Sequence, residues 1–358
     1  MTIAMMRRFV SRLRPPSARL VMRATAGAAG ALTAAAGAQG LYLQQQYRRL
    51  PEARGPLSGV ALWRMQRRRS SSAAPADAAA SSASGEALAP RRPGTVCGGG
   101  GGDRRSCRTI LFIGDSLVTG VGCNPDGGDG PVLPRAVAEF VSRHTRTDVS
   151  WTALGETGGN IDTLHRKLLP RVAAEAGRRR ALGQPIDVVV VVCGLNDFKN
   201  AYQGATKTAT HFRAALSDFV AAIQSHAGVE CAVVLPALPV HRAPVFGGVW
   251  PLQPFLEKLA GLWDEQKRSL AAENAAARAR VESGVRATLR RIFFVGGEDD
   301  EIPEWWAARE YWAEDGIHPN DAGYRIWGEH VAESITRQLG LRMSTDEWQA
   351  LKRRAAPV

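Results

Sequence analysis

An unbroken run of valines at positions 188–192 constrains the fold of this chain more than any other feature of its sequence. The run is short, β-branched and bounded by glycine and polar residues, which is typical of a β-strand. Because apolar residues occupy every position and do not alternate with polar ones, both faces of the strand are expected to be covered, as in a parallel sheet. Buried strands of this kind are predicted at 109–113, 150–154, 186–192, 232–235 and 292–295.

Longer amphipathic stretches separate the predicted strands. Alternation of strands and helices predicts an α/β fold, in which right-handed crossovers place helices against a mostly parallel sheet. In such a sheet the reactive groups gather beyond the carboxyl ends of the strands. The predicted helices span 131–144, 161–181, 208–226, 252–282 and 322–339.

Nearly all the net charge precedes this region. The first 108 residues contain 18 arginines and four acidic residues, a formal charge of +14, whereas the whole chain carries +12, so the remainder carries −2. No nucleic-acid partner is therefore indicated for the folded part. Residues 1–50 contain arginines but no acidic residue, which favours a mitochondrial or plastid transit peptide. An alanine- and glycine-rich run at 24–43 leaves a membrane anchor, and so membrane association, as the alternative, and a disordered tail as a third.

The composition divides the chain into four parts. Residues 1–50 are the basic targeting or anchor leader, 51–105 a low-complexity linker, 106–340 the folded domain and 341–358 a basic C-terminal tail. The linker prediction depends on Ser, Ala, Pro and Gly between residues 70 and 102, which cannot bury enough surface to offset the cost of ordering. Five cysteines without a CxxC pair signal neither a disulfide framework nor a zinc site, and no metal is expected.

Two motifs contain a candidate nucleophile and its base. Gly114-Asp115-Ser116 follows the first predicted strand of the domain, where a serine and its backbone N–H can face a substrate. Asp315-Gly316-Ile317-His318-Pro319 lies near the domain's end, and an aspartate three residues before a histidine can orient it as the base that a serine hydroxyl requires. Taken alone, each motif is also compatible with a capped turn before a helix.

Two further motifs follow predicted strands and contain candidate oxyanion donors. The segment 155–159 is rich in glycine, and a glycine there, Gly155 or Gly158, exposes its backbone N–H. Gly194-Leu195-Asn196-Asp197 follows the valine run, and the Asn196 carboxamide can stabilise an oxyanion without proton transfer. Ordinary turns explain both motifs when each is considered alone.

Together, these four motifs resemble the four sequence blocks of the SGNH/GDSL hydrolases, a family of serine esterases and lipases, over about residues 109–339. The resemblance implies a flavodoxin-like three-layer α/β/α sandwich and no cofactor. It also implies a catalytic triad of Ser116, His318 and Asp315, and an oxyanion hole formed by the N–H groups of Ser116 and Gly158 and the Asn196 side chain.

The expected function is that of a serine esterase, which hydrolyses lipid or small aliphatic or aryl carboxylic esters through an acyl-enzyme on Ser116. The alternatives are an acyltransferase or a carbohydrate O-acetyl esterase with the same site, and an inactive binding module. Trp250, Phe255 and Trp312 belong to aromatic clusters near the expected site and are candidates for substrate binding. Core packing is the other explanation for these three residues.

Overall fold

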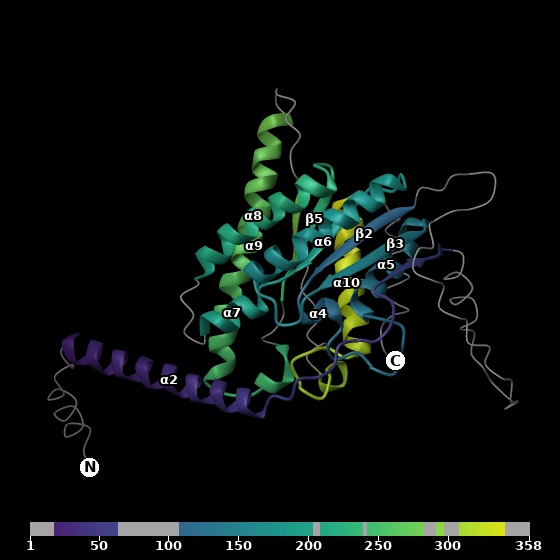
Figure 1. The fold of residues 1–358 in the computed structure, drawn as a ribbon. Helices are drawn as coiled ribbons and strands as arrows, with labels where there is room; N and C mark the ends of the chain where they lie inside the picture. Colours follow the sequence, from purple (N-terminus) through teal and green to yellow (C-terminus); the bar gives the residue numbers. More distant parts are fainter. Residues whose placement is uncertain are drawn as a thin grey trace, which may run out of the picture.

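The computed structural model describes residues 18–63, 107–202, 208–238, 242–282, 291–296 and 308–340. Its centre is a six-stranded sheet with the order β1-β3-β2-β4-β5-β6 (Figure 1). All five predicted strands are present and parallel, whereas β1 adds an antiparallel edge. The strands are β1 (Ser58–Ala61), β2 (Arg108–Gly114), β3 (Val149–Gly155), β4 (Val188–Val192), β5 (Ala232–Pro236) and β6 (Arg291–Val295).

Helices cover both faces of this sheet, and the predicted three-layer α/β/α fold is confirmed. On one face α5 (Val132–Thr145) and α10 (Asp321–Gln338) share a core with the sheet. On the other face α6 (Ile161–Ala181), α8 (Ala209–Ala227) and α9 (Leu252–Glu282) form the second core. The connecting segments include α4 (Ser116–Thr119), α7 (Leu195–Tyr202), η2 (Pro244–Phe246) and η5 (Arg309–Tyr311).

The valine run shows why both faces are apolar. Val188, Val190 and Val192 pack into the α5–α10 core, whereas Val189 and Val191 pack into the other. Each side chain is at least 98% buried, so each burial stabilises the fold by about 1.5 kcal/mol or more. A polar residue at any of these positions would be buried without a partner.

The structure corrects the predicted linker. Residues 51–63, assigned to the linker, run along the domain and form β1, which pairs with β3 from Ser58 opposite Thr152 to Ala61 opposite Val149. The preceding residues 47–57, here called the strap, cross the carboxyl end of the sheet. The strap and β1 are held by hydrogen bonds from Ala53 N to Thr119 O (3.2 Å), Gly130 N to Arg54 O (2.9 Å), Ala153 N to Leu57 O (2.7 Å) and Ser142 Oγ to Ala61 O (3.1 Å).

A glycine substitution can test how tightly the strap packs. Gly130 has φ +77°, and a Cβ there would lie 2.1 Å from the Pro56 carbonyl oxygen of the strap. Gly128 also has positive φ, at +64°, but its Cβ would meet nothing within 4 Å. We expect Gly130→Ala to lower the free energy of unfolding by about 1–3 kcal/mol more than Gly128→Ala, because only Gly130→Ala adds a clash to the shared backbone strain. Denaturant unfolding measures both variants, and equal losses would show that the strap yields freely.

The segment predicted as a leader also contacts the domain. Helix α2 (Ala18–Gln46) projects beyond the sheet in Figure 1, and its C-terminal part lies against α9. Ala36 is 1% exposed and belongs to the second core, and Gln39 Nε2 donates to the Trp250 carbonyl oxygen at 2.8 Å. Within the described ranges, no helix combines the length and apolarity needed to cross a bilayer. The predicted C-terminal tail, residues 1–17 and the linker from residue 64 lie outside the described residues.

The cysteines depart from the sequence prediction at one position. Cys123, Cys193 and Cys231 are free and buried. Cys107, at the start of the domain, is instead disulfide-bonded. Cysteine spacing alone does not report which residues meet in space, so this bond had no signal in the sequence.

Candidate active site

The sheet register brings three of the predicted motifs together at the carboxyl ends of the parallel strands. Gly114, the last residue of β2, pairs with Gly155 at the end of β3 and with Val192 at the end of β4. The segments that follow these strands therefore leave the sheet side by side. A side chain at Gly114 would not fit, because its Cβ would lie 2.5 Å from the Val192 carbonyl oxygen.

Ser116 is the first residue of α4, two positions after this glycine. Asp115 caps the helix, since its Oδ1 accepts a hydrogen bond from Leu117 N at 3.1 Å. The cap fixes the start of the helix and holds Ser116 at the carboxyl end of β2. Ser116 is 6% exposed, so its hydroxyl lies in a largely dry environment.

The predicted base lies in a tight loop between η5 and α10. Trp312 and Pro319 form an isolated antiparallel bridge, and Ala313 N donates to the His318 carbonyl oxygen at 2.9 Å. Asn320 then caps α10 by accepting from Gly323 N at 3.0 Å. The two ends of the loop are thus hydrogen-bonded to each other, and the loop holds His318 next to Ser116.

Hydrogen bonds join Ser116 to His318 and His318 to Asp315. His318 Nε2 is 3.0 Å from Ser116 Oγ, and His318 Nδ1 is 2.6 Å from Asp315 Oδ2. The other Asp315 oxygen accepts from the backbone N–H groups of Ile317 and His318, both at 3.0 Å. These are the three residues predicted from the sequence as nucleophile, base and orienting acid.

Hydrogen bonding controls the ionisation of Asp315. Burial disfavours its charge, but the hydrogen bonds from the His318 ring and from two backbone N–H groups outweigh burial and lower its pKa below the ordinary value. Asp315 is therefore ionised and accepts the proton on Nδ1. In that tautomer the lone pair of Nε2 faces the Ser116 hydroxyl.

Two backbone N–H groups beside Ser116 can donate to an oxyanion. Within the described part of the chain, neither the Ser116 nor the Gly158 N–H donates to an acceptor. Gly158 has φ +79°, and the space where a Cβ would stand is empty. Gly155, the other glycine considered, packs against α4, because a Cβ there would lie 2.3 Å from Thr119 Cγ2. Of these two glycines, Gly158 is therefore the one with open space for an oxyanion next to its backbone.

Asn196 lies beside these groups, but both of its amide hydrogens have acceptors. Asn196 Nδ2 donates to Asp115 Oδ2 at 3.0 Å and to the Gly159 carbonyl oxygen at 3.2 Å. The contact to Asp115 fixes the orientation of the amide. An oxyanion bound here would replace or share the longer contact, the one to Gly159.

Buried charges lie behind the site. Burial raises the pKa of Asp115 to about 6 and that of Asp197 to about 6, partly opposed by backbone N–H donors and by the charge of Lys267. Lys267 is fully buried and donates to Asp264 Oδ1 and the Pro236 carbonyl oxygen, both at 2.9 Å. Both Asp197 oxygens accept from Ile161 N at 3.1 Å, which joins α7 to the start of α6.

The raised pKa of Asp197 predicts a pH-dependent change in stability. A carboxyl whose folded-state pKa is raised contributes stability below its unfolded pKa and loses it as the pH rises through the folded value. Asp197→Asn removes this loss and can keep the acceptor for Ile161 N. We expect the free energy of unfolding of the variant, relative to wild type, to increase by about 2 kcal/mol between pH 4.5 and 8. Denaturant unfolding across this range checks it, and a pH-independent difference would contradict it.

The three predicted substrate-binding aromatics lie in different environments. Trp312 is 5% exposed and packs in the α5–α10 core, at the base of the His318 loop. Phe255 is half-buried against the second core, whereas Trp250 is 67% exposed. Their role in substrate binding stays a prediction. Trp305 and Trp306, which belong to the same aromatic cluster of the sequence as Trp312, lie outside the described residues.

Sequence reasoning missed three residues that hold the His318 loop. The Arg309 guanidinium donates to the carbonyl oxygens of Trp312 (2.8 Å), Ala313 (2.7 Å) and Glu314 (3.1 Å). Gly122 has φ +93°, and a Cβ there would lie 2.5 Å from the Pro319 carbonyl oxygen. The hydroxyl of the buried Tyr324 donates to the Val121 carbonyl oxygen at 2.7 Å. Only Gly122, in a glycine-rich loop a few residues after Ser116, had a signal in the sequence.

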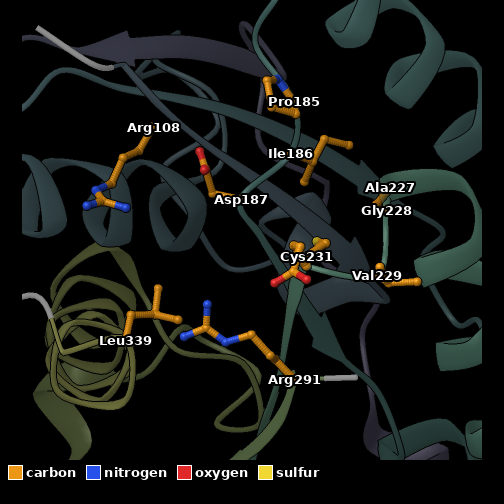
Figure 2. A pocket seen from close by; sticks show the side chains of 11 residues that line it. Arg108, Pro185, Ile186, Asp187, Ala227, Gly228, Val229, Cys231, Arg291 and Leu339 are labelled. Atoms are coloured by element: carbon orange, nitrogen blue, oxygen red, sulfur yellow. The ribbon is translucent and has the colours of Figure 1, made fainter. Parts of the chain in front are cut away.

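A separate pocket lies at the opposite end of the strands. Figure 2 shows the side chains of Arg108, Asp187, Arg291 and Leu339 around it, and its volume is about 500 Å³. It opens at the amino ends of the parallel strands, where α8 and α10 end. The two arginines lie near the negative ends of these helix dipoles, which accounts for them without a ligand. The reactive groups described above all lie at the carboxyl ends of the strands, away from this pocket.

A comparison with known families agrees with this geometry. A family model described as GDSL-like Lipase/Acylhydrolase matches residues 112–326, more than half of the chain. The chain belongs to this family. The prediction of a GDSL-type hydrolase that acts on ester bonds is thereby confirmed, and the matched range includes Ser116, Gly158, Asn196, Asp315 and His318.

Solved structures resemble this GDSL hydrolase at low identity. An acetylxylan esterase from Geobacillus stearothermophilus is 16% identical, with a TM-score of 0.42 over 66% of this chain and 97% of its own. A lipase from a goat rumen metagenome is 17% identical, with a TM-score of 0.43 over 64% of this chain and 97% of its own. A search of curated proteins found no match. None of these likenesses specifies the substrate of this hydrolase.

Proposed function

We propose that this GDSL hydrolase is a serine esterase that forms an acyl-enzyme on Ser116. The observation that carries the proposal is the pair of hydrogen bonds that joins Ser116 Oγ to His318 Nε2 at 3.0 Å and His318 Nδ1 to Asp315 at 2.6 Å. A serine hydroxyl becomes nucleophilic when a base accepts its proton, and the base requires a fixed tautomer to do so. The three side chains supply the nucleophile, the base and the group that fixes the tautomer.

The reaction proceeds in two steps. In the first, Ser116 Oγ attacks the ester carbonyl carbon while its proton moves to His318 Nε2, and His318 then protonates the departing alcohol. In the second, a water molecule loses its proton to His318 and attacks the acyl carbon, which releases the acid and restores the serine. Asp315 stays ionised throughout and stabilises the imidazolium.

The tetrahedral intermediates require donors for their oxyanion. The N–H groups of Ser116 and Gly158 supply two, and Asn196 Nδ2 supplies the third when the oxyanion replaces the Gly159 carbonyl oxygen. Because Asn196 is oriented by Asp115, the amide requires little reorganisation as charge develops. The substrates are carboxylic esters of lipids or of small aliphatic or aryl alcohols.

The test is a direct search for the covalent intermediate. The full chain is treated with a fluorophosphonate, and peptide mass spectrometry locates the adduct. We expect modification of Ser116 and none of Ser142, a buried serine whose Oγ donates to the Ala61 carbonyl oxygen. Turnover of p-nitrophenyl esters of graded chain length, with and without a chelator, then defines the acyl preference. A folded protein that gives neither an adduct nor turnover would overturn the proposal.

An added alcohol distinguishes hydrolysis from acyl transfer. With water as the only acceptor, an esterase releases the acid, and the alcohol diverts part of the acyl-enzyme to a new ester. We expect free acid as the main product at low alcohol concentration. Ester as the main product under the same conditions would show an acyltransferase.

A further inference from the structure

Exposed apolar side chains lie on the last turns of α2, at the start of the strap and on the segment that Gln39 of α2 contacts. Leu41 and Tyr42 of α2 are 58% and 61% exposed, and Trp250 is 67% exposed. Gln39, within one helical turn of Leu41 and Tyr42, donates to the Trp250 carbonyl oxygen, so the helix and the tryptophan segment are held together. Tyr47, 39% exposed, follows at the start of the strap. These four residues, Leu41, Tyr42, Tyr47 and Trp250, are here called the apolar rim.

The apolar rim lies at the catalytic end of the molecule. The segment that contains Trp250 contacts the His318 loop, because Val245 N donates to the Gly316 carbonyl oxygen at 3.3 Å. On the other side, the strap that follows Tyr47 contacts α4, because Ala53 N donates to the Thr119 carbonyl oxygen at 3.2 Å. Figure 1 shows α2 passing the same end of the molecule as α4, the helix that starts with Ser116.

Positive charge adjoins the apolar rim. Arg48 and Arg49 are both exposed at the start of the strap. Residues 1–51 contain no acidic residue, and Glu52 is the first of the chain. Leu and aromatic side chains beside arginines are the combination that binds the interface of an anionic bilayer, with apolar groups at the acyl boundary and arginines at the headgroups.

We propose that the apolar rim and its two arginines dock the enzyme on the surface of an anionic phospholipid bilayer. This places Ser116 at the interface, so the substrates are lipid esters presented by that surface. The choice of substrate rests on the proposed function, whereas the docking does not. A second copy of the chain fits the rim less well, because an isologous contact uses the same surface patch on both copies and would therefore join two positively charged patches.

Vesicle binding by the full chain tests the docking. The probes are vesicles of phosphatidylcholine alone and of phosphatidylcholine with phosphatidylglycerol. We expect wild type to bind the anionic vesicles more tightly, and Leu41→Ser/Tyr42→Ser to lower that affinity about tenfold or more. Arg48→Gln/Arg49→Gln should lower it roughly 20- to 30-fold, since each basic residue near the surface contributes about 1 kcal/mol. The matched control is Leu182→Ser/Val229→Ser, which removes two exposed apolar residues at the opposite edge and should bind like wild type.

Turnover separates docking from catalysis. Leu41→Ser/Tyr42→Ser should lower hydrolysis of an ester held in anionic vesicles at least as much as binding, and should leave hydrolysis of soluble p-nitrophenyl acetate within about twofold. Vesicle binding without hydrolysis of any ester would refute the esterase and leave the docking intact. The docking is overturned if wild type binds neither kind of vesicle or if the rim variant binds like wild type. It is also overturned if wild type is a dimer that the rim variant dissociates.

Discussion

Ser116→Ala is expected to lower kcat/KM for a p-nitrophenyl ester by roughly 10⁴- to 10⁶-fold, the loss that follows removal of the nucleophile from a serine triad. The variant retains the open backbone N–H groups at position 116 and at Gly158, so ester can still bind and be polarised. No acyl group can then be carried by the enzyme. Residual turnover should show no burst and should follow the attack of water alone.

A structural explanation for this loss can be excluded by stability. Ser116 Oγ has a hydrogen bond to His318, so its removal should cost about 1 kcal/mol of unfolding free energy. Ser142→Ala loses a comparable buried hydrogen bond, to the Ala61 carbonyl oxygen, but lies away from the triad. We expect similar stability for the two variants, measured by denaturant unfolding, and wild-type activity for Ser142→Ala alone. Activity of Ser116→Ala within a hundredfold of wild type would assign the nucleophile to another residue.

The position of the candidate active site could be predicted from the sequence because each of its motifs occupies a few consecutive residues after a strand. The strands β2 and β4 contain continuous apolar runs, β3 alternates apolar residues with Ser150 and Thr152, and each of the three precedes a motif residue by a few positions. Parallel strands end at one edge, so Ser116, Gly158 and Asn196 had to meet there. In the structure, Gly114 pairs with both Gly155 and Val192, so the ends of the three strands lie next to one another.

The edge strand could not be read in the same way. β1 is four residues long, Ser-Gly-Val-Ala, and only Ala61 of the four is buried. Its placement depends on backbone hydrogen bonds to β3 and on the fit of the strap against Gly130. Such contacts leave no apolar pattern, and the adjoining Ser-, Ala- and Gly-rich composition predicted a linker instead.

The supporting polar residues were equally hidden. Lysine and arginine are usually exposed, yet Lys267 is fully buried beneath the carboxyl end of β5 and Arg309 holds three carbonyl groups of the His318 loop. Periodicity reports which face of a helix is apolar. It does not report that a distant strand end or loop provides oxygen partners for a single cation.

Asp315→Asn separates the orienting role of Asp315 from its role in holding the loop. The asparagine oxygen can still accept from the backbone N–H groups of Ile317 and His318, as Asp315 Oδ1 does at 3.0 Å. Its amide nitrogen, however, would donate to His318 Nδ1. The imidazole proton would then lie on Nε2 and face Ser116, so the base could not accept the serine proton. We expect kcat to fall about 10⁴-fold with KM little changed.

Asp315→Ala is the matched comparison for this prediction. Alanine removes both the orienting contact and the acceptor for the two backbone N–H groups, so it should lower the free energy of unfolding more than asparagine does. It does not impose the wrong tautomer, however, and a fraction of its His318 can still present a lone pair to Ser116. We therefore expect the asparagine variant to be the more stable and the less active of the two. If Asp315→Asn retained activity within tenfold of wild type, Asp315 would not fix the tautomer, and the charge on His318 would have to be stabilised elsewhere.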